Sequence, residues 1–183
     1  MSARSVHRFG LSTSLATRFT LALLLLGAGA AAAEMSAAPT ILRIERNKNR
    51  NAVHYRARMS ADCSLLNPPV EVVWRMQEED PVEEQPLLPR ERPAYGYKVL
   101  KLTKYDAKLE LRAVPSRELM LRSMRTGNHC AAELTGQIEG RRATVQRVYV
   151  YANEDSLVPR VQWIELYGTG VTGQLRERIS ETR

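Results

Sequence analysis

The chain has 183 residues, with 27 Lys and Arg against 20 Asp and Glu, and a formal net charge of +7. Hydrophobic residues make up 44% and charged residues 26%, which argues against a disordered or fibrous chain and is typical of a globular protein. The basic residues are scattered and interleaved with acids instead of being clustered with aromatics, so the composition also argues against nucleic-acid binding.

Residues 1–33 have the three parts of a secretory signal peptide. The basic part contains no acid, and its arginines are Arg4, Arg8 and Arg18. The apolar part, residues 19–33, is about 15 residues long and so shorter than the roughly 20 that a transmembrane helix needs. This part ends in the small residues Ala31-Ala32-Ala33, directly before Glu34. We expect cleavage after Ala33 and a periplasmic or secreted protein without a transmembrane span; an uncleaved N-terminal anchor is the alternative.

The expected mature chain, residues 34–183, has the length of one domain. Removing the three leader arginines leaves 24 basic and 20 acidic residues, a net charge of +4. The working protein is therefore less basic than its precursor. We expect residues 34–39 to be a short disordered lead-in ending at Pro39, and residues 40–183 to form a single β-rich domain.

From residue 41 onward, short segments of strand character are separated by turn signals at a spacing of about ten residues. The asparagine-rich residues 47–51, for example, have good turn chemistry. The expected strands are residues 41–46, 52–59, 70–76, 95–102, 104–114, 117–124, 130–138, 143–151, 161–166 and 175–179. The series favours an all-β fold, an antiparallel sandwich or barrel of about nine to ten short strands. At most one short helical turn is expected, over residues 116–124, with Ser116 as its cap.

Residues 77–93 interrupt this series with six acids and four prolines. Proline lacks a backbone donor and fixes its own φ, so the segment is predicted to be a long loop. Loops longer than about 12–15 residues are often functional. The acids could bind a divalent cation weakly, although a run of charge is usually a solvated loop.

The two cysteines of the chain, Cys63 and Cys130, are predicted to form a disulfide. A lone pair of cysteines in an exported domain is usually oxidised. The two lie far apart in the sequence without CxxC spacing, and only His129 is next to either of them, which argues against a metal or redox pair. Two free thiols are the alternative.

Four motifs follow one another along the expected mature chain. They are IERNKNRNAVHY at residues 44–55, PVEVVW at 69–74, ERPAYG at 91–96, and IELYG at 164–168 followed by Thr172-Gly173. Their content and order resemble DUF4833, a family of bacterial secreted proteins defined only as a domain of unknown function, although the first motif has an extra residue in its turn. The resemblance covers nearly the whole mature chain and implies one exported domain. It implies no catalytic or binding residues, because the family name carries no activity.

A candidate ligand-binding site is formed by five residues at or near strand ends: Arg46, Asn49, Trp74, Arg92 and Tyr95. Arg46 and Arg92 stand at expected strand–loop boundaries, where a guanidinium group can bind a carboxylate or phosphate. Trp74 and Tyr95 could supply an apolar wall with a polar tip. If the loop 77–93 folds over one end of the sheet, these residues converge on a pocket.

A structural role competes with this site. Arg46 would then pair with Glu91 or Glu45 and hold the loop 77–93 in place, while Trp74 fills the core. No P-loop, nucleophile elbow or dinucleotide fingerprint is present in the sequence. No cofactor or metal is expected either, because His54 and His129 have no chelating spacing, and His54 is predicted to be solvated on a polar strand face.

Three functions remain open. A non-enzymatic ligand-binding module of the cell envelope, which holds a small or apolar molecule in a cavity between facing strands, is favoured. An envelope protein–protein interaction module that docks through an edge strand or the 77–93 loop comes second. An unrecognised hydrolase comes third, with His54, Glu45 and Glu91 as its candidate groups.

Overall fold

A computed structural model of the chain describes residues 38–153 and 160–180. The predicted signal peptide and its cleavage point lie outside the described residues, as do residues 34–37 of the predicted lead-in. The described residues belong to one unit, residues 35–183. Among them, no helix is both long and apolar enough to cross a membrane.

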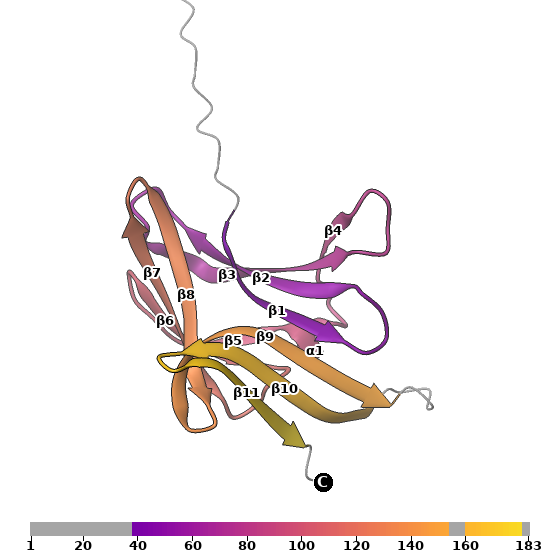
Figure 1. Cartoon of the computed structure of the whole chain (residues 1–183). Coiled ribbons are helices and arrows are strands. Elements are labelled where there is room, and N and C mark those ends of the chain that lie inside the picture. The colour runs from indigo at the N-terminus through magenta and orange to yellow at the C-terminus, as the bar shows by residue number, and fades with distance from the viewer. Residues whose placement is uncertain (1–37, 154–159, 181–183) are drawn as a thin grey trace, which may run out of the picture. The chain divides into compact units, whose positions relative to one another are not determined.

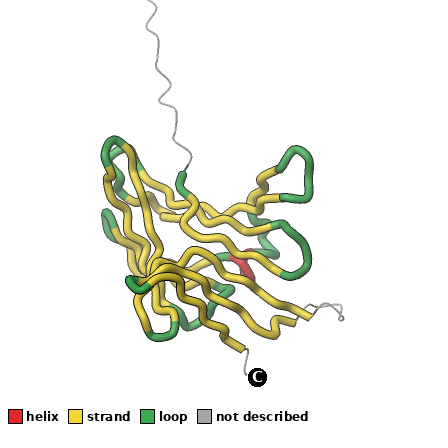
Figure 2. Tube along the Cα trace, in the orientation of Figure 1, coloured by secondary structure: helices red, strands yellow, loops and turns green. Residues whose placement is uncertain are grey.

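The described residues form eleven strands and one short helix (Figures 1 and 2). The elements are β1 (Thr40–Arg46), β2 (Ala52–Met59), β3 (Leu65–Met76), β4 (Glu83–Pro86), α1 (Arg92–Tyr95), β5 (Tyr97–Leu102), β6 (Asp106–Leu111), β7 (Glu118–Thr126), β8 (His129–Ile138), β9 (Arg141–Asn153), β10 (Arg160–Gly170) and β11 (Gly173–Ser180). The all-β prediction is confirmed, and each of the ten expected strand segments overlaps an observed strand.

Two local predictions are wrong. The segment 77–93 is not a continuous loop, because β4 pairs with the end of β3 and α1 begins at Arg92. The ion pair between Arg56 of β2 and Glu84 of β4 also holds this short strand to the sheet. The alternative of a helical turn over residues 116–124 fails as well: this segment is β7, and Ser116 has a φ of 64°, outside the helical region.

The strand β9 is the branching point of the sheet. Along one edge it pairs with β10, from Ala143 to Asn153. Along the other edge, residues 141–144 pair with the end of β8, and residues 147–150 pair in parallel with β1. Because β1 occupies that edge beyond residue 146, the first half of β8 must leave β9. Two arms therefore extend from β9, an N-terminal arm of β1–β4 and a second arm of β5–β8.

The hydrophobic core lies between these two arms and above β9–β11. Alternating side chains supply it, as a period of two requires for strands with one buried face. Its largest fully buried members include Tyr55, Leu42, Ile44, Leu109, Leu111, Leu121, Leu134, Ile138 and Leu166. The sequence-based expectation was a cavity between facing strands. The two pockets formed by the described residues instead open to the surface beside the core.

The two arms approach each other along a seam between β3 and β5 that is not closed into a barrel. In place of a strand partner, the Tyr97 hydroxyl accepts a hydrogen bond from the Val70 N–H at 3.2 Å and donates one to the Val70 carbonyl at 2.7 Å. Further along the seam, the Leu65 N–H donates to the Lys104 carbonyl at 2.7 Å. Side-chain and backbone hydrogen bonds thus join the arms without a continuous ladder.

The predicted disulfide between Cys63 and Cys130 is present, and it fastens one end of this seam. It joins the β2–β3 connection to the start of β8, where Figure 1 shows the two hairpin ends side by side. Neighbouring contacts reinforce the junction: the Ser123 hydroxyl donates to the Cys63 carbonyl at 2.7 Å, and Arg125 donates to the Ala61 carbonyl at 2.8 Å. The two arms are therefore linked covalently at this end.

Replacing both cysteines with alanine should lower the free energy of unfolding by about 4 kcal/mol, because a cross-link over 67 residues restricts the unfolded chain. Urea unfolding of the oxidised protein, the reduced protein and the Cys63→Ala/Cys130→Ala variant measures this loss. The reduced protein controls for the packing lost with the buried Cys63 side chain. Equal midpoints for the oxidised and reduced proteins would contradict a stabilising disulfide.

Candidate functional site

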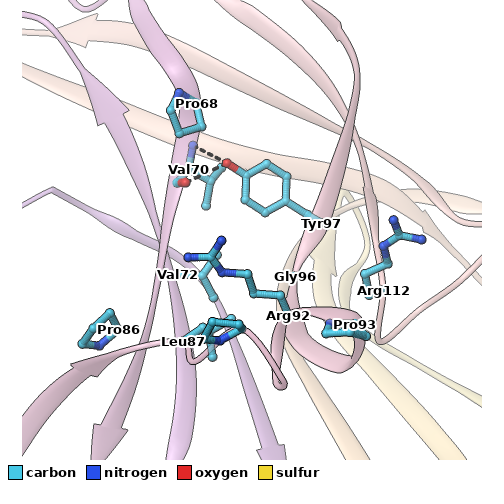
Figure 3. A pocket seen from close by; sticks show the side chains of 11 residues that line it. Pro68, Val70, Val72, Pro86, Leu87, Arg92, Pro93, Gly96, Tyr97 and Arg112 are labelled. Carbon is cyan, nitrogen blue, oxygen red and sulfur yellow. Dashed lines mark hydrogen bonds between the residues drawn. The ribbon is translucent and has the colours of Figure 1, made fainter.

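The larger pocket lies at the open end of the seam, and we call it the seam pocket (Figure 3). Its volume is about 760 Å³. Eleven residues of β3, the β4–α1 segment, β5 and the end of β6 line it: Pro68, Val70, Val72, Pro86, Leu87, Pro89, Arg92, Pro93, Gly96, Tyr97 and Arg112. Four prolines give it stiff walls, and the buried Val70 and Leu87 form part of its apolar surface.

The charge in the seam pocket is wholly positive. Arg92 and Arg112 are its ionisable residues besides Tyr97, and no acid lines it. Figure 3 shows the Arg92 side chain extended into the space between β3 and Gly96, while Arg112 stands at the far side and points away from Arg92. Burial raises the pKa of Tyr97, so its hydroxyl stays neutral and keeps its two hydrogen bonds to Val70. A single guanidinium group therefore reaches into an otherwise apolar pocket.

A smaller pocket of about 240 Å³ lies on the other side of Pro86, and we call it the Arg46 pocket. Its lining residues come from the ends of β1 and β3, from β4 and from α1: Arg46, Asn51, Trp74, Met76, Gln85, Pro86, Leu88, Glu91 and Tyr95. The rings of Trp74 and Tyr95 meet edge to face, with centroids 5.1 Å apart. The guanidinium carbon of Arg46 lies 4.9 Å from the centroid of the Trp74 ring, in a cation–π contact.

Local structure fixes the walls of the Arg46 pocket. Tyr95 is held by the fully buried Tyr55, whose hydroxyl donates to the Tyr95 carbonyl. Glu91 precedes α1, and its carboxylate accepts the Leu88 N–H at 2.8 Å. The buried Asn51 amide oxygen accepts the Glu78 N–H at 3.2 Å, which holds the β1–β2 turn against the segment after β3. The pocket is therefore built on the core and not on a free loop.

The sequence-derived site is assembled only in part. Arg46, Trp74 and Tyr95 come together in the Arg46 pocket. Arg92 is separated from them and lines the seam pocket instead. Asn49 lines neither pocket, and its buried side-chain oxygen has no hydrogen-bond partner. The predicted five-residue set is thus divided between two neighbouring sites.

The competing structural role for Arg46 does not match the contacts of the described residues. The Glu45 carboxylate pairs with Arg43 and Arg147, at 2.8 and 3.2 Å. Glu91 accepts a backbone N–H, and neither acid forms an ion pair with Arg46 in the described part of the chain. Trp74 does belong to the hydrophobic core, so that half of the structural interpretation is correct.

Two of the three candidate hydrolase groups, His54 and Glu91, lie on different sides of the sheet, and the third, Glu45, pairs with Arg43 and Arg147. His54 alternates with the core residues Val53 and Tyr55 and so faces outward, whereas Glu91 lines the Arg46 pocket. The expectation of a solvated His54 is wrong, since both ring nitrogens are buried without a hydrogen-bond partner. Burial, followed by the charges of Arg75 and Arg56, lowers the pKa of this imidazole. No general acid–base pair is formed from His54 and Glu91.

The described residues contain no group of three or more His, Cys, Asp or Glu side chains that could hold a metal ion. The acids of the segment 77–93 are in part engaged elsewhere. Glu84 pairs with Arg56, and Glu78 accepts the Arg50 N–H at 3.3 Å. These contacts do not support the weak divalent-cation site that the run of acids suggested.

On the outer face of β9–β11, arginine and aromatic side chains stack on one another around one buried acid, and we call this cluster the grid. Trp163 stacks on Tyr151, with centroids 4.8 Å apart and rings 3° from parallel. The Arg147 guanidinium lies 3.8 Å from the Tyr167 ring centroid. Between these stacks, Glu165 is 2% exposed and accepts hydrogen bonds from Tyr167, Arg176 and Arg178. The grid has no described hollow, and we interpret it as cross-strand stabilisation of a sheet face that meets water.

Sequence reasoning missed Arg112 and Tyr97 of the seam pocket. The sequence did contain a signal for Arg112. A hairpin with its turn at Thr103-Lys104 places Arg112 opposite the residues around Gly96. In the structure the Arg112 N–H donates to the Gly96 carbonyl at 3.0 Å. The role of Tyr97 has no local signal, because its partner Val70 lies in another arm and 27 residues away.

Comparison with known proteins gives one positive result. The model of a family described as "Domain of unknown function (DUF4833)" matches residues 42–178. No curated protein and no solved structure matches the chain.

Because of Glu165, the free energy of unfolding should depend measurably on pH in the acidic range. Burial alone would raise the pKa of this carboxyl, but the hydrogen bonds from Arg176, Tyr167 and Arg178 outweigh burial and lower it from 4.5 to about 2. The folded-state pKa lies below the unfolded-state value, so this stabilisation is present above pH 4.5 and is lost as the pH falls towards 2. This difference between the folded-state and unfolded-state pKa corresponds to up to about 3 kcal/mol in the free energy of unfolding.

Urea unfolding between pH 2 and 6 tests this expectation. The Glu165→Gln variant should lose less stability than the natural protein as the pH falls. Glu118→Gln serves as the matched control, because this exposed glutamate pairs only with Lys108 at the surface and should leave the slope unchanged. Parallel pH curves for the natural protein and Glu165→Gln would show that the Glu165 cluster does not stabilise the fold.

Proposed function

Because the chain belongs to the DUF4833 family, whose description assigns no activity, we propose a function from its own geometry: the domain is a non-enzymatic binding module that holds a small amphipathic anion in the seam pocket. The single observation that carries this proposal is a cavity of about 760 Å³ with largely apolar walls, two arginines and no acid. Ligand pockets have volumes of roughly 300–1,000 Å³, mostly apolar linings and a few placed polar groups.

The chemistry of the lining selects the ligand class. Val70, Val72 and Leu87 offer an apolar surface for a hydrocarbon portion, which gains free energy by leaving water. The Arg92 guanidinium, extended into the pocket, offers a charge-assisted hydrogen bond to a carboxylate or phosphate. With no carboxylate in the lining, nothing repels an anion or attracts a cation. A short alkyl carboxylate or alkyl phosphate fits this combination.

The structure gives less support to docking through an edge strand. Where β3 extends beyond its pairing with β4, it contains the exposed Pro68, which cannot donate to a new strand, and β4 ends at Pro86. Lys98 and Lys101 lie on the edge strand β5, and lysines at an edge discourage pairing with another chain. At the edges formed by β3, β4 and β5, these features favour a ligand pocket over strand addition as the binding mode; the edge strand β11 lies away from both pockets.

We also propose that the domain works in the periplasm or outside the cell, because the N-terminal 33 residues have the composition of a cleaved signal peptide. The Cys63–Cys130 disulfide is compatible with an oxidising compartment. It was predicted from that compartment, so the export proposal rests on the leader alone. In this setting, an arginine-containing apolar pocket would bind an anionic amphiphile of the cell envelope.

Isothermal titration calorimetry should detect binding of decanoate and decyl phosphate, studied below their micelle concentrations, and much weaker binding of decan-1-ol. Arg92→Gln should weaken decanoate binding about tenfold, because a hydrogen bond to a charged group is worth about 1.5 kcal/mol. Arg90→Gln is the matched control: Arg90 is exposed two residues away and does not line the pocket. Equal affinity for decanoate and decan-1-ol, or no effect of Arg92→Gln, would refute the proposal.

Export can be tested separately. We expect the protein recovered from the periplasm or culture medium to begin at Glu34, as the small residues before it favour cleavage there. Intact-mass measurement of that fraction, beside a chain lacking residues 2–33 as the cytoplasmic control, gives the answer. Recovery of the full-length chain in the membrane fraction would instead indicate an uncleaved anchor.

A further inference from the structure

We propose that the Arg46 pocket is a second, separate binding site, and that it takes a small molecule carrying both a carboxylate and an ammonium group, such as a free α-amino acid. This proposal does not depend on the function of the seam pocket. It rests on unpaired buried donors, on the sign and position of the charges in the lining, and on the size of the pocket. Each of these differs from the corresponding property of the seam pocket.

Two buried N–H groups of the Arg46 pocket have no hydrogen-bond partner. They are Nε of Arg46 and Nε1 of Trp74, both on residues that line the pocket, and Trp74 is only 8% exposed. Both atoms can only donate. Buried donors in folded proteins are almost always paired, and these two belong to residues that line the pocket, so we expect a ligand of this site to bring an acceptor to at least one of them. A carboxylate, with two acceptor oxygens, is suited to this role.

The charge of Arg46 favours an anionic acceptor over a neutral one. The guanidinium is positioned by its contact with the Trp74 ring at 4.9 Å and forms no ion pair within the described ranges. A guanidinium group that is fixed in this way loses little entropy when it binds a carboxylate. In this pocket the arginine is therefore available to a ligand, whereas the neighbouring Arg43 and Arg147 are both engaged with Glu45.

The acid in the lining determines the second half of the ligand. Glu91 places a carboxylate in the pocket that also contains Arg46, and its contact with the Leu88 N–H holds it in place. Tyr95, which also lines the pocket, presents an aromatic ring, and ring faces attract ammonium groups. A ligand with only a carboxylate would be repelled by Glu91, and it would have no positive group to offset this repulsion. A zwitterion can place its carboxylate near Arg46 and its ammonium group near Glu91.

The size of the pocket limits the ligand to a small molecule. Its volume of about 240 Å³ equals the share of roughly eight water molecules in liquid water. Such a space suits an amino acid with a short side chain better than the longer alkyl chain that we propose for the seam pocket. The apolar contribution of Met76 and Leu88 to the lining favours a small apolar side chain over a polar one.

The chain contains two tryptophans, which makes a direct optical test possible. In a Trp163→Phe background, Trp74 is the remaining tryptophan and lies in the proposed site, so excitation at a wavelength that tyrosine does not absorb reports on it alone. We expect alanine or valine to change its fluorescence saturably, with propionate and propylamine at least tenfold weaker. Arg46→Gln should weaken alanine binding at least tenfold. Glu91→Gln should weaken alanine but not propionate.

Two controls separate this site from its surroundings. Arg50→Gln removes an exposed arginine of the same turn that lines neither pocket, and it should leave alanine binding unchanged. Arg92→Gln, which disturbs the seam pocket, should also leave it unchanged, so the two proposals can fail independently. Circular dichroism verifies that each variant is folded. Trp74→Phe, followed by calorimetry, gives a second route, since it removes the Nε1–H donor and keeps an aromatic ring.

Three results would overturn the proposal. The first is the absence of saturable binding of any zwitterion up to millimolar concentrations, which would indicate that water serves the donors. The second is that Arg46→Gln binds alanine as tightly as the natural protein does. The third is that the natural protein has equal affinity for alanine and propionate. The last result would leave a plain carboxylate site and contradict the role of Glu91.

Discussion

The fold depends on the pairing of β9 with three strands. Since β10 covers one edge of β9, the strands β1 and β8 must share the other edge, one parallel and one antiparallel to β9. Both cannot continue along the same edge, so the sheet divides into two arms that enclose the core. The core, the seam between β3 and β5, and the two pockets are consequences of this division.

The seam pocket forms where the two arms do not meet, whereas the Arg46 pocket lies between the N-terminal arm and the segment that leads to α1. The segment from β4 to α1 bridges the gap at this end, with Pro86 shared by the two linings. Its prolines make it stiff, and Tyr55 fixes its far end by a hydrogen bond from inside the core. The segment therefore acts as a partition that separates an anionic-ligand pocket from a pocket with both charges.

Local pattern was sufficient to predict ten of the strands, because most of them have one buried face and turn residues at their ends. Between β8 and β9, for example, Glu139 and Gly140 both have positive φ, as a tight turn requires. The pattern could not reveal β4, whose four residues are all exposed and include a proline. Nor could it reveal the parallel pairing of β1 with β9, since Ile44 and Val148 are brought together only by the whole topology.

Of the residues that the sequence grouped into one site, Arg46, Trp74 and Tyr95 lie in the same pocket, because each stands at or near the end of its element. Arg92 lines the other pocket, since the single turn of α1 places Arg92 and Tyr95 on different sides of the partition. Helical geometry at residues 92–95 was not evident in a segment rich in proline and acid. Without that turn, an extended chain gives no reason to separate the two residues.

The seam is fastened by bonds of different kinds along its length. A disulfide at Cys63 closes one end, a backbone hydrogen bond at Leu65 follows, and the Tyr97 hydroxyl bonds both backbone groups of Val70 in the wall of the seam pocket. The covalent link between the arms therefore stands apart from the pocket, and it contributes no residue to the pocket wall.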